Sequence, residues 1–210
     1  MADKPLAPQA RPEPNGGVST PRTVLLVEGE SDLVALHALA ARRGEDLAAA
    51  GVDVVAMGGI TNLRGHALRD GPHGRVLALV GLYDVPEEHH VRRGLLAAGV
   101  LGTGDGGWAD IALTDIGFHA CDRDLEDELL RAVGLDGAEA VIEAAGEGPS
   151  LRLLAQMPAQ RGWTREEVLR RFLTSQSGRK ARYARLLVEA LDLDRAPAPL
   201  VAVLEDALRR

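Results

Sequence analysis

Acidic side chains follow three of the apolar segments in this sequence. Glu28 and Asp32 come after the apolar run 23–27, and Asp84 comes after the run 75–82. A third group follows the short apolar stretch 111–118 and consists of Asp122, Asp124, Glu126 and Asp127. Carboxylates that meet at one place repel one another and have raised pKa values unless a cation neutralises them. Because ligation by oxygen alone suits hard cations, we expect a Mg²⁺ or Mn²⁺ ion there.

Each of these acidic residues also has a purely structural explanation. Asp32 alone would be a favourable charge at a helix N-terminus, and Glu126 and Asp127 would form a solvated first helical turn. Their occurrence after three successive strands favours the metal site over this alternative.

The apolar runs predict strands, and the segments between them predict helices. The run 23–27, TVLLV, leads through a tight turn into a helical pattern that starts at Leu33. The same unit recurs at 52–57 and 75–82, and a helix is expected over 86–98. Strands that are apolar throughout and alternate with helices indicate an α/β fold, a Rossmann-like parallel sheet of about four strands with helices on both faces. Ligands of such sheets bind beyond the carboxyl ends of the strands, where the acidic residues stand.

The chain divides into three segments by composition. Residues 1–20 hold four of the eleven prolines and no apolar periodicity, so we expect a disordered tail. Residues 21–137 carry all the expected strands and form the α/β domain. Residues 138–210 show only helical patterns punctuated by Gly and Pro, which predicts a helical C-terminal extension.

The net charge of −7 averages over two unlike regions. Residues 152–185 carry nine Arg or Lys side chains and two glutamates, a local balance of +7, so the rest of the chain carries −14. Aromatic residues are interleaved with these cations, as in a surface that contacts nucleic-acid phosphates. From this segment we predict four nucleic-acid-binding side chains: Arg170, Arg171, Arg179 and Arg182. The alternative is that about half of these arginines pair with the acidic part of the same chain.

Nothing in the sequence indicates a membrane. It has no run of about 18 uncharged apolar residues and no signal-peptide pattern, so we expect a cytoplasmic protein without membrane contact.

Three motifs together resemble a known domain. VEGESD (27–32), LVGLYD (79–84) and DLEDEL (124–129) resemble the TOPRIM domain, in particular that of the OLD (overcoming lysogenization defect) nucleases. The resemblance covers residues 22–135, and GRKARYA (178–184) extends it, because OLD-type nucleases carry a functional lysine downstream of the acidic motifs. The only lysines of the chain are Lys4 and Lys180.

The resemblance implies a role for each of five residues. Glu28, Asp32, Asp84 and Glu126 would bind Mg²⁺ or Mn²⁺, and Lys180 would stabilise the charge of the transition state. Glu28, Asp84 and Lys180 would be the catalytic residues of a divalent-metal-dependent endonuclease that acts on DNA.

The chain departs from the family pattern in two places. The second acidic motif is usually Asp-x-Asp, whereas this chain reads Asp84-Val85-Pro86. Either Glu87 or Glu88 substitutes, or one ion is lost, or the site is a one-metal or degenerate version. OLD nucleases also join the domain to an ABC-type ATPase, and these 210 residues hold no phosphate-binding G-x-x-x-x-G-K-[ST] loop. A separate ATPase subunit is therefore an expected partner, and a homodimer stays open.

Two other functions remain as alternatives to DNA cleavage. The chain could be a non-catalytic or partner-dependent module that works with a separate ATPase. It could also transfer nucleotidyl or phosphoryl groups to RNA or nucleotides, since the same kind of metal site serves primases and RNA maturases.

Overall fold

Four parallel strands form one sheet at the centre of the fold. The computed structural model describes residues 21–102, 111–176 and 178–210, so the predicted disordered tail 1–20 lies outside the described residues. The strand order is β2-β1-β3-β4. Their bounds are Thr23–Val27 for β1, Val52–Ala56 for β2, Ala78–Asp84 for β3 and Phe118–Cys121 for β4. The predicted α/β fold with a parallel sheet of about four strands is confirmed.

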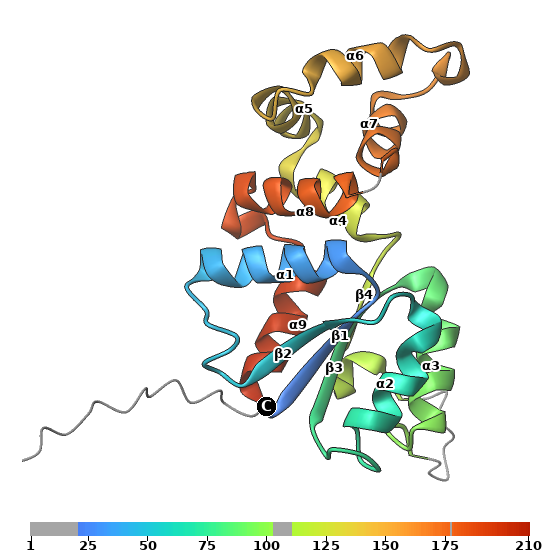
Figure 1. Ribbon diagram of the computed structural model, residues 1–210, viewed down its shortest axis with the longest axis vertical. Coiled ribbons are helices and arrows are strands. Elements are labelled where there is room, and N and C mark those ends of the chain that lie inside the picture. Colours follow the sequence, from blue (N-terminus) through green and yellow to red (C-terminus); the bar gives the residue numbers. More distant parts are fainter. Residues whose placement is uncertain (1–20, 103–110, 177) are drawn as a thin grey trace, which may run out of the picture.

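Helices cover both faces of the sheet (Figure 1). One face packs against α2 (Leu63–Asp70) and α3 (Glu88–Ala97), and the other packs against α1 (Glu30–Arg43) and α9 (Ala198–Arg209). The sheet is therefore the middle layer of three, which is why its strands are buried on both sides.

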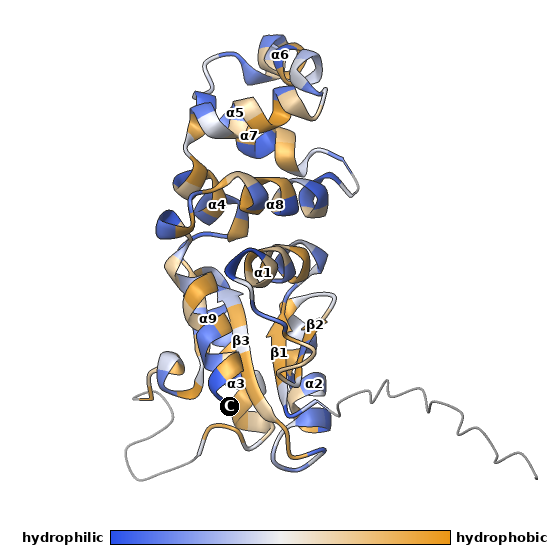
Figure 2. Ribbon diagram, turned by 90° about the vertical axis from the view of Figure 1, so that its left-hand side faces the viewer, coloured by the Kyte–Doolittle hydropathy of each residue, from blue (hydrophilic) through white to orange (hydrophobic). Residues whose placement is uncertain are grey.

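The side chains of β1 show this double burial directly. Leu25 and Val27 belong to the apolar core shared with α1 and α9, whereas Val24 and Leu26 belong to the core shared with α2 and α3. Successive residues of a strand point to opposite faces, so a strand between two helical layers must be apolar at every position. Figure 2 shows β1 and β3 as largely hydrophobic ribbons.

The remaining helices stack outward from α1. Helix α8 (Arg179–Ala190) packs along α1, and α4 (Leu125–Val133) packs against α8. In Figures 1 and 2 the helices farthest from the sheet are α5, α6 and α7. Their bounds are Leu135–Ala144, Gly148–Gln156 and Arg165–Thr174. No helix in the described ranges is long and apolar enough to cross a lipid bilayer.

The C-terminal helices do not all stay away from the sheet. The described residues from 138 onward contain helices and no strand, as predicted, but α9 returns to pack on β1, β3 and β4. The boundary between residues 137 and 138 stays a prediction, because the core of the sheet includes side chains from both sides of it.

The predicted positions of strands three and four need correction. The expected strand over 111–118 is wrong, because Leu113–Ile116 form a 3-10 turn and the strand begins at Phe118. Gly117 ends that turn with a left-handed φ of 85°, which glycine adopts without strain. The third strand begins at Ala78 rather than at residue 75, because residues 72–75 form a turn and the exposed Val76 follows it.

One glycine of β3 is required by close packing. Gly81 pairs with Phe118 of β4, and a Cβ at Gly81 would lie 2.5 Å from the ring of Phe118. A side chain at position 81 would therefore force either the ring of Phe118 or the pairing of β3 with β4 to shift, and this pairing sets Asp84 opposite Cys121.

Candidate metal centre

The first two carboxylates of the site lie where β1 turns into α1. Glu28 follows the last residue of β1, and Gly29 is the N-cap of α1. The backbone N–H of Gly29 donates to Asp32 Oδ2 at 2.9 Å, so Asp32 closes the first turn of the helix. Asp32 therefore does stabilise the N-terminus of α1, as its structural explanation holds. This hydrogen bond uses Oδ2 and leaves Oδ1 out.

A turn after β2 holds the backbone of Glu28. The N–H of Gly59 donates to the carbonyl of Glu28 at 3.0 Å, and the N–H of Met57 donates to the carbonyl of Val27 at 2.9 Å. Gly58 and Gly59 have φ angles of 71° and 120°, which side-chain-bearing residues rarely adopt. The side-chain amide of Asn62 donates to the carbonyls of Met57 (2.9 Å) and Gly58 (3.2 Å).

This turn is a supporting element that the sequence reasoning did not single out as part of the site. The signal was present, since two consecutive glycines follow a strand of a parallel sheet after a single intervening residue, Met57. The turn fixes the main chain from which the Glu28 side chain projects.

Asp84 ends β3 beside these two carboxylates. Burial, followed by the negative charges of Asp32 and Glu28, raises the pKa of Asp84 from its ordinary 3.8 to about 7. The pKa values of Glu28 and Asp32 are also raised, in both cases first by burial. The strand-end carboxylates therefore come close enough to oppose one another's ionisation, as their positions in the sequence predicted.

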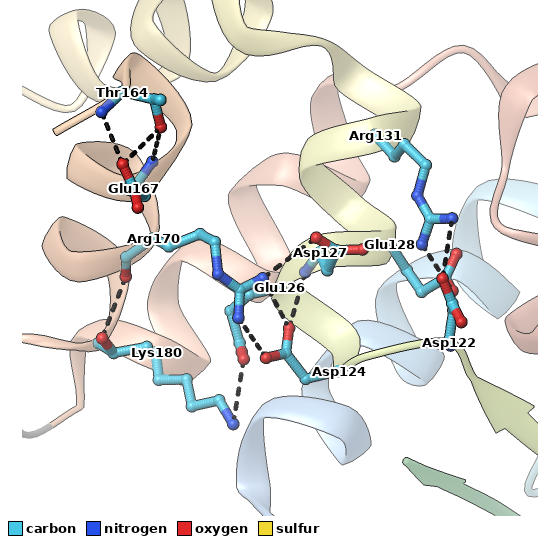
Figure 3. Close-up of polar contacts among 11 residues, drawn as sticks. Asp122, Asp124, Glu126, Asp127, Glu128, Arg131, Thr164, Glu167, Arg170 and Lys180 are labelled. Atoms are coloured by element: carbon cyan, nitrogen blue, oxygen red, sulfur yellow. Dashed lines mark hydrogen bonds and ion pairs between the residues drawn. The ribbon is translucent and has the colours of Figure 1, made fainter. Parts of the chain in front are cut away.

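Glu126 joins the same group from the first turn of α4. Its side chain is 6% exposed, and its Oε2 lies 3.2 Å from Nζ of Lys180 (Figure 3). Its other oxygen, Oε1, is buried without a hydrogen-bond partner. Burial raises the pKa of Glu126, and Asp124 and Asp32 act in the same direction while Lys180 opposes them. Glu126 is therefore a buried carboxylate with one oxygen that could still bind a metal ion or accept a hydrogen bond. It is not part of a solvated first helical turn.

Lys180 is the cation of this group. It lies in the first turn of α8, and about half of its side chain is exposed. Burial acts to lower the pKa of Lys180, but Glu126, Asp32 and Asp84 together raise it above its ordinary value. One ammonium thus faces several carboxylates, which leaves the group with an excess of negative charge.

A cleft of about 580 Å³ opens beside Glu28, Asp32 and Lys180. Its walls come from residues 28–32, the Gly58–Gly59 turn and the start of α8 with Gly178, Lys180 and Ala181. The cleft gives Glu28, Asp32 and Lys180 a common access to solvent, and glycines form much of its rim.

The structure distinguishes the two glutamates that follow Pro86. The charge of Glu87 contributes to raising the pKa of Glu28, so Glu87 lies on the side of the acidic group. Glu88 forms an ion pair of 2.7 Å with Arg92 in the next turn of α3, whereas Glu87 has a longer contact of 3.8 Å with His90. Of the two, Glu87 is the one placed to compensate for Pro86.

The donor chemistry of the group fits a hydrated divalent cation. All of its side-chain donors are carboxylate oxygens, and Glu126 Oε1 is a buried oxygen that still lacks a partner. Among the described residues, however, no three His, Cys, Asp or Glu side chains stand close enough to hold an ion together. Mg²⁺ keeps several of its waters and needs only one or two direct carboxylates, so this spacing suits an ion bound partly through water.

Three of the four predicted nucleic-acid-binding arginines pair within the chain. Arg170 donates to Asp124 through two nitrogens, at 3.1 and 2.5 Å, and lies 3.3 Å from Asp127. Arg179 (2.6 Å) and Arg182 both pair with Glu147. Arg171 is exposed, and in the described part of the chain no ion pair involves it. The assignment of all four to nucleic acid stays a prediction, and Arg171 is the member free to meet a phosphate without losing a bond.

Comparison with known proteins finds one matching family model and several similar folds. Residues 21–67 match the family model described as "Overcoming lysogenization defect protein-like, TOPRIM domain". The fold resembles the C-terminal region of the Xanthomonas campestris pv. campestris OLD protein with a TM-score of 0.68 at 24% identity, over 90% of this chain and 95% of that one. The C-terminal region of the Burkholderia pseudomallei OLD protein gives a TM-score of 0.65 at 24% identity, over 90% and 98% of the two chains. A search of curated sequences gives no match.

These comparisons cover the site unequally. Glu28 and Asp32 lie within the stretch that matches the family model, whereas Asp84, Glu126 and Lys180 lie beyond it. The structural likeness extends the shared fold over 90% of the chain.

Proposed function

We propose that this chain, a TOPRIM-domain protein that resembles the C-terminal region of OLD proteins, hydrolyses phosphodiester bonds in DNA with the help of a divalent cation. The observation that carries the proposal is the group of strand-end carboxylates Glu28, Asp32 and Asp84, whose pKa values are all raised, together with the buried Glu126 that contacts Lys180 at 3.2 Å. Carboxylates that share a site in this way are stabilised when a cation binds between them.

The four carboxylates would hold Mg²⁺ or Mn²⁺ at the carboxyl end of the sheet. When bound, such an ion would help to orient a water for attack and would withdraw charge from the scissile phosphate. Glu126, which is buried and has one oxygen unpartnered, would contribute from the α4 side. Glu28 and Asp84 would contribute from the strand ends.

Lys180 would act on the phosphate itself. Its side chain is about half exposed and lines the cleft, so Nζ can reach a substrate that lies there. Its ammonium would offset the negative charge that develops on the phosphate oxygens, and its contact with Glu126 would hold it in position before substrate arrives.

The arrangement of the carboxylates also favours a second candidate function. Because no three of them among the described residues are close enough to hold an ion directly, binding requires water bridges or a further closure. A separate ABC-type ATPase subunit would supply that closure in a partner-dependent module that is inert alone. Transfer of nucleotidyl or phosphoryl groups to RNA or nucleotides remains the third alternative.

The proposal is tested with the purified full chain, supercoiled plasmid DNA and Mn²⁺ or Mg²⁺. We expect nicking or degradation that stops in excess chelator and that Glu28→Gln or Asp84→Asn abolishes. Asp53→Asn is the matched control, because it removes an exposed carboxylate from β2 without touching the acidic group. Cleavage that persists in excess chelator, or in Glu28→Gln, would contradict the proposal.

Calorimetry with Mn²⁺ separates the first two candidates. Metal uptake that Asp84→Asn removes, without DNA cleavage, would support the partner-dependent module. Absence of any metal uptake would contradict a metal site in this chain. Incubation with nucleoside triphosphates and labelled RNA detects the transferase, and Lys180→Arg shows whether any cation suffices at that position.

A further inference from the structure

Arg170 connects the outer helices to the end of α4 that carries the acidic site. It projects from α7, and its guanidinium forms a two-nitrogen contact with Asp124 and a further ion pair of 3.3 Å with Asp127. Figure 3 shows these contacts next to the pair formed by Glu126 and Lys180. The side chain of Arg170 is 16% exposed, so this is a largely enclosed contact rather than a surface ion pair.

The two partners of Arg170 define where α4 begins. Asp124 is the N-cap of α4, and its Oδ1 accepts the N–H of Asp127 at 2.9 Å. The same Oδ1 accepts from Arg170 at 3.1 Å. Arg170 therefore holds the capping carboxylate and the residue that it caps. Glu126 stands between these two residues, so its backbone is fixed by the same contacts.

Without a cation at this end, the first turn of α4 would be strongly negative. It carries Asp124, Glu126, Asp127 and Glu128, and it faces Asp32 and Asp84, whose charges act on the same group. Arg131 offsets Asp127 and Glu128 from within α4, and Lys180 offsets Glu126. In the described part of the chain, Arg170 is the cation whose ion pairs include Asp124.

A role in binding phosphate would conflict with these contacts. A bidentate grip on a phosphate uses the guanidinium nitrogens that Asp124 and Asp127 already occupy. Arg171, the next residue of α7, is exposed and makes no such contact among the described residues. The neighbouring arginines therefore have different environments although the sequence presents them as equivalent.

We propose that Arg170 is a positioning residue that clamps the first turn of α4 and thereby sets the place of Glu126 in the acidic site. The clamp itself is a property of the metal-free chain, and its effect on metal binding rests on the proposed function. Arg171 supplies the matched comparison, since it has the same side chain one position along the same helix.

The first test measures hydrogen–deuterium exchange of the amides of residues 124–130 in the metal-free full chain. Arg170→Ala is expected to speed exchange in the first turn of α4 about tenfold or more, because the capping carboxylate of Asp124 loses the guanidinium that holds it in place. Arg170→Lys keeps the charge but not the two-nitrogen geometry, so most of the increase should remain. Arg171→Ala should leave exchange of these amides as in the unmodified chain. Equal protection in all of these variants would overturn the clamp.

The second test measures Mn²⁺ affinity and DNA affinity separately. Arg170→Ala should weaken Mn²⁺ binding by about tenfold, in the range seen when groups that orient metal ligands are removed. Binding of a labelled duplex in excess chelator should change less than about twofold, with the same salt dependence. A loss of duplex affinity with a shallower salt slope, and no change in Mn²⁺ affinity, would assign Arg170 to phosphate contact and overturn the proposal.

Two further variants keep the result decisive. If Arg170→Ala does not fold, Arg170→Lys carries both measurements, because it retains the aliphatic stem and the charge. Pairing Arg170→Gln with Asp124→Asn replaces the ion pair by two amides that can still hydrogen-bond, so it should recover part of the lost protection. If the unmodified chain binds no Mn²⁺, the proposed function fails, while the exchange experiment still decides whether the clamp exists.

Discussion

Replacement of Asp84 by Asn should stabilise the metal-free protein at alkaline pH. Asp84 is held at the end of β3 where burial and the charges of Asp32 and Glu28 raise its pKa to about 7. In the unfolded chain its pKa returns to about 4. Between these two values the folded protein holds a proton that the unfolded chain has released, so the free energy of unfolding falls as pH rises.

The size of the effect follows from the interval between 3.8 and about 7. At 1.36 kcal/mol per pH unit, a fully buried group would lose about 4 kcal/mol across this interval. Asp84 is only partly buried and its charge is partly screened, so we expect about 2 kcal/mol. Asn has nearly the same shape and cannot ionise, so Asp84→Asn removes this loss.

The assay is urea unfolding followed by circular dichroism, in excess chelator at pH 4.5 and pH 8. Asp84→Asn should exceed the free energy of unfolding of the unmodified chain by only about 0.5 kcal/mol at pH 4.5, where most of the loss has yet to occur, and by about 2 kcal/mol at pH 8. Added Mn²⁺ should reverse the order, because the ion binds the ionised carboxylate of the unmodified chain. A variant that is equally or less stable at pH 8 in chelator would refute the reasoning that Asp84 stands in a crowded acidic site.

Three further predictions concern the surroundings of the site and the core. Glu87→Gln should weaken Mn²⁺ binding about tenfold in calorimetry, while Glu88→Gln, which removes the pair with Arg92, should not. Equal effects of the two variants would contradict the placement of Glu87 beside the acidic group. Asn62→Ala removes two hydrogen bonds from the turn after β2, so urea unfolding should show a loss of about 1 to 2 kcal/mol together with weaker Mn²⁺ binding. Phe172→Ala should lower the free energy of unfolding by about 3 to 5 kcal/mol, because Phe172 is buried in the core that also contains Leu25 of β1. The variant should unfold in a single transition. Two separate transitions would show that the helices fold independently of the sheet.

The positive charge of residues 152–185 illustrates the limit of composition. Counting residues predicts a cationic face for nucleic acid, but the described structure pairs most of these cations with carboxylates of the same chain. Among the pairs are Arg165 with Asp136 and Glu139, Arg179 with Glu147, and Lys180 with Glu126. The partners lie up to about fifty residues away in the sequence, so no local pattern reveals them. The alternative that about half of the arginines pair internally describes this segment better than a wholly free surface does.

The sequence by itself determined the sheet and its acidic edge. A strand that is apolar at every position, such as 23–27, must be buried on both faces of its sheet. In a parallel sheet the carboxyl ends of the strands lie at the same edge. Glu28, Asp32 and Asp84 therefore had to approach one another once the strands were identified. The position of β4 was predicted wrongly because the segment Leu113–Ile116, with one apolar residue at each end and two polar residues between them, can form a turn as readily as a strand.

Only the tertiary structure decided which residues complete that edge. Lys180 contacts Glu126, although more than fifty residues separate them in the sequence. The charge of Glu87, rather than that of Glu88, acts on Glu28. Arg170 pairs with Asp124, whereas Arg171 is exposed. These choices depend on how α4, α7 and α8 stack on α1, and that stacking follows from apolar contacts between distant segments. The periodicity of side chains along a single helix does not reveal contacts with distant segments. The adjacent residues Arg170 and Arg171 therefore acquire different environments only when the chain has folded.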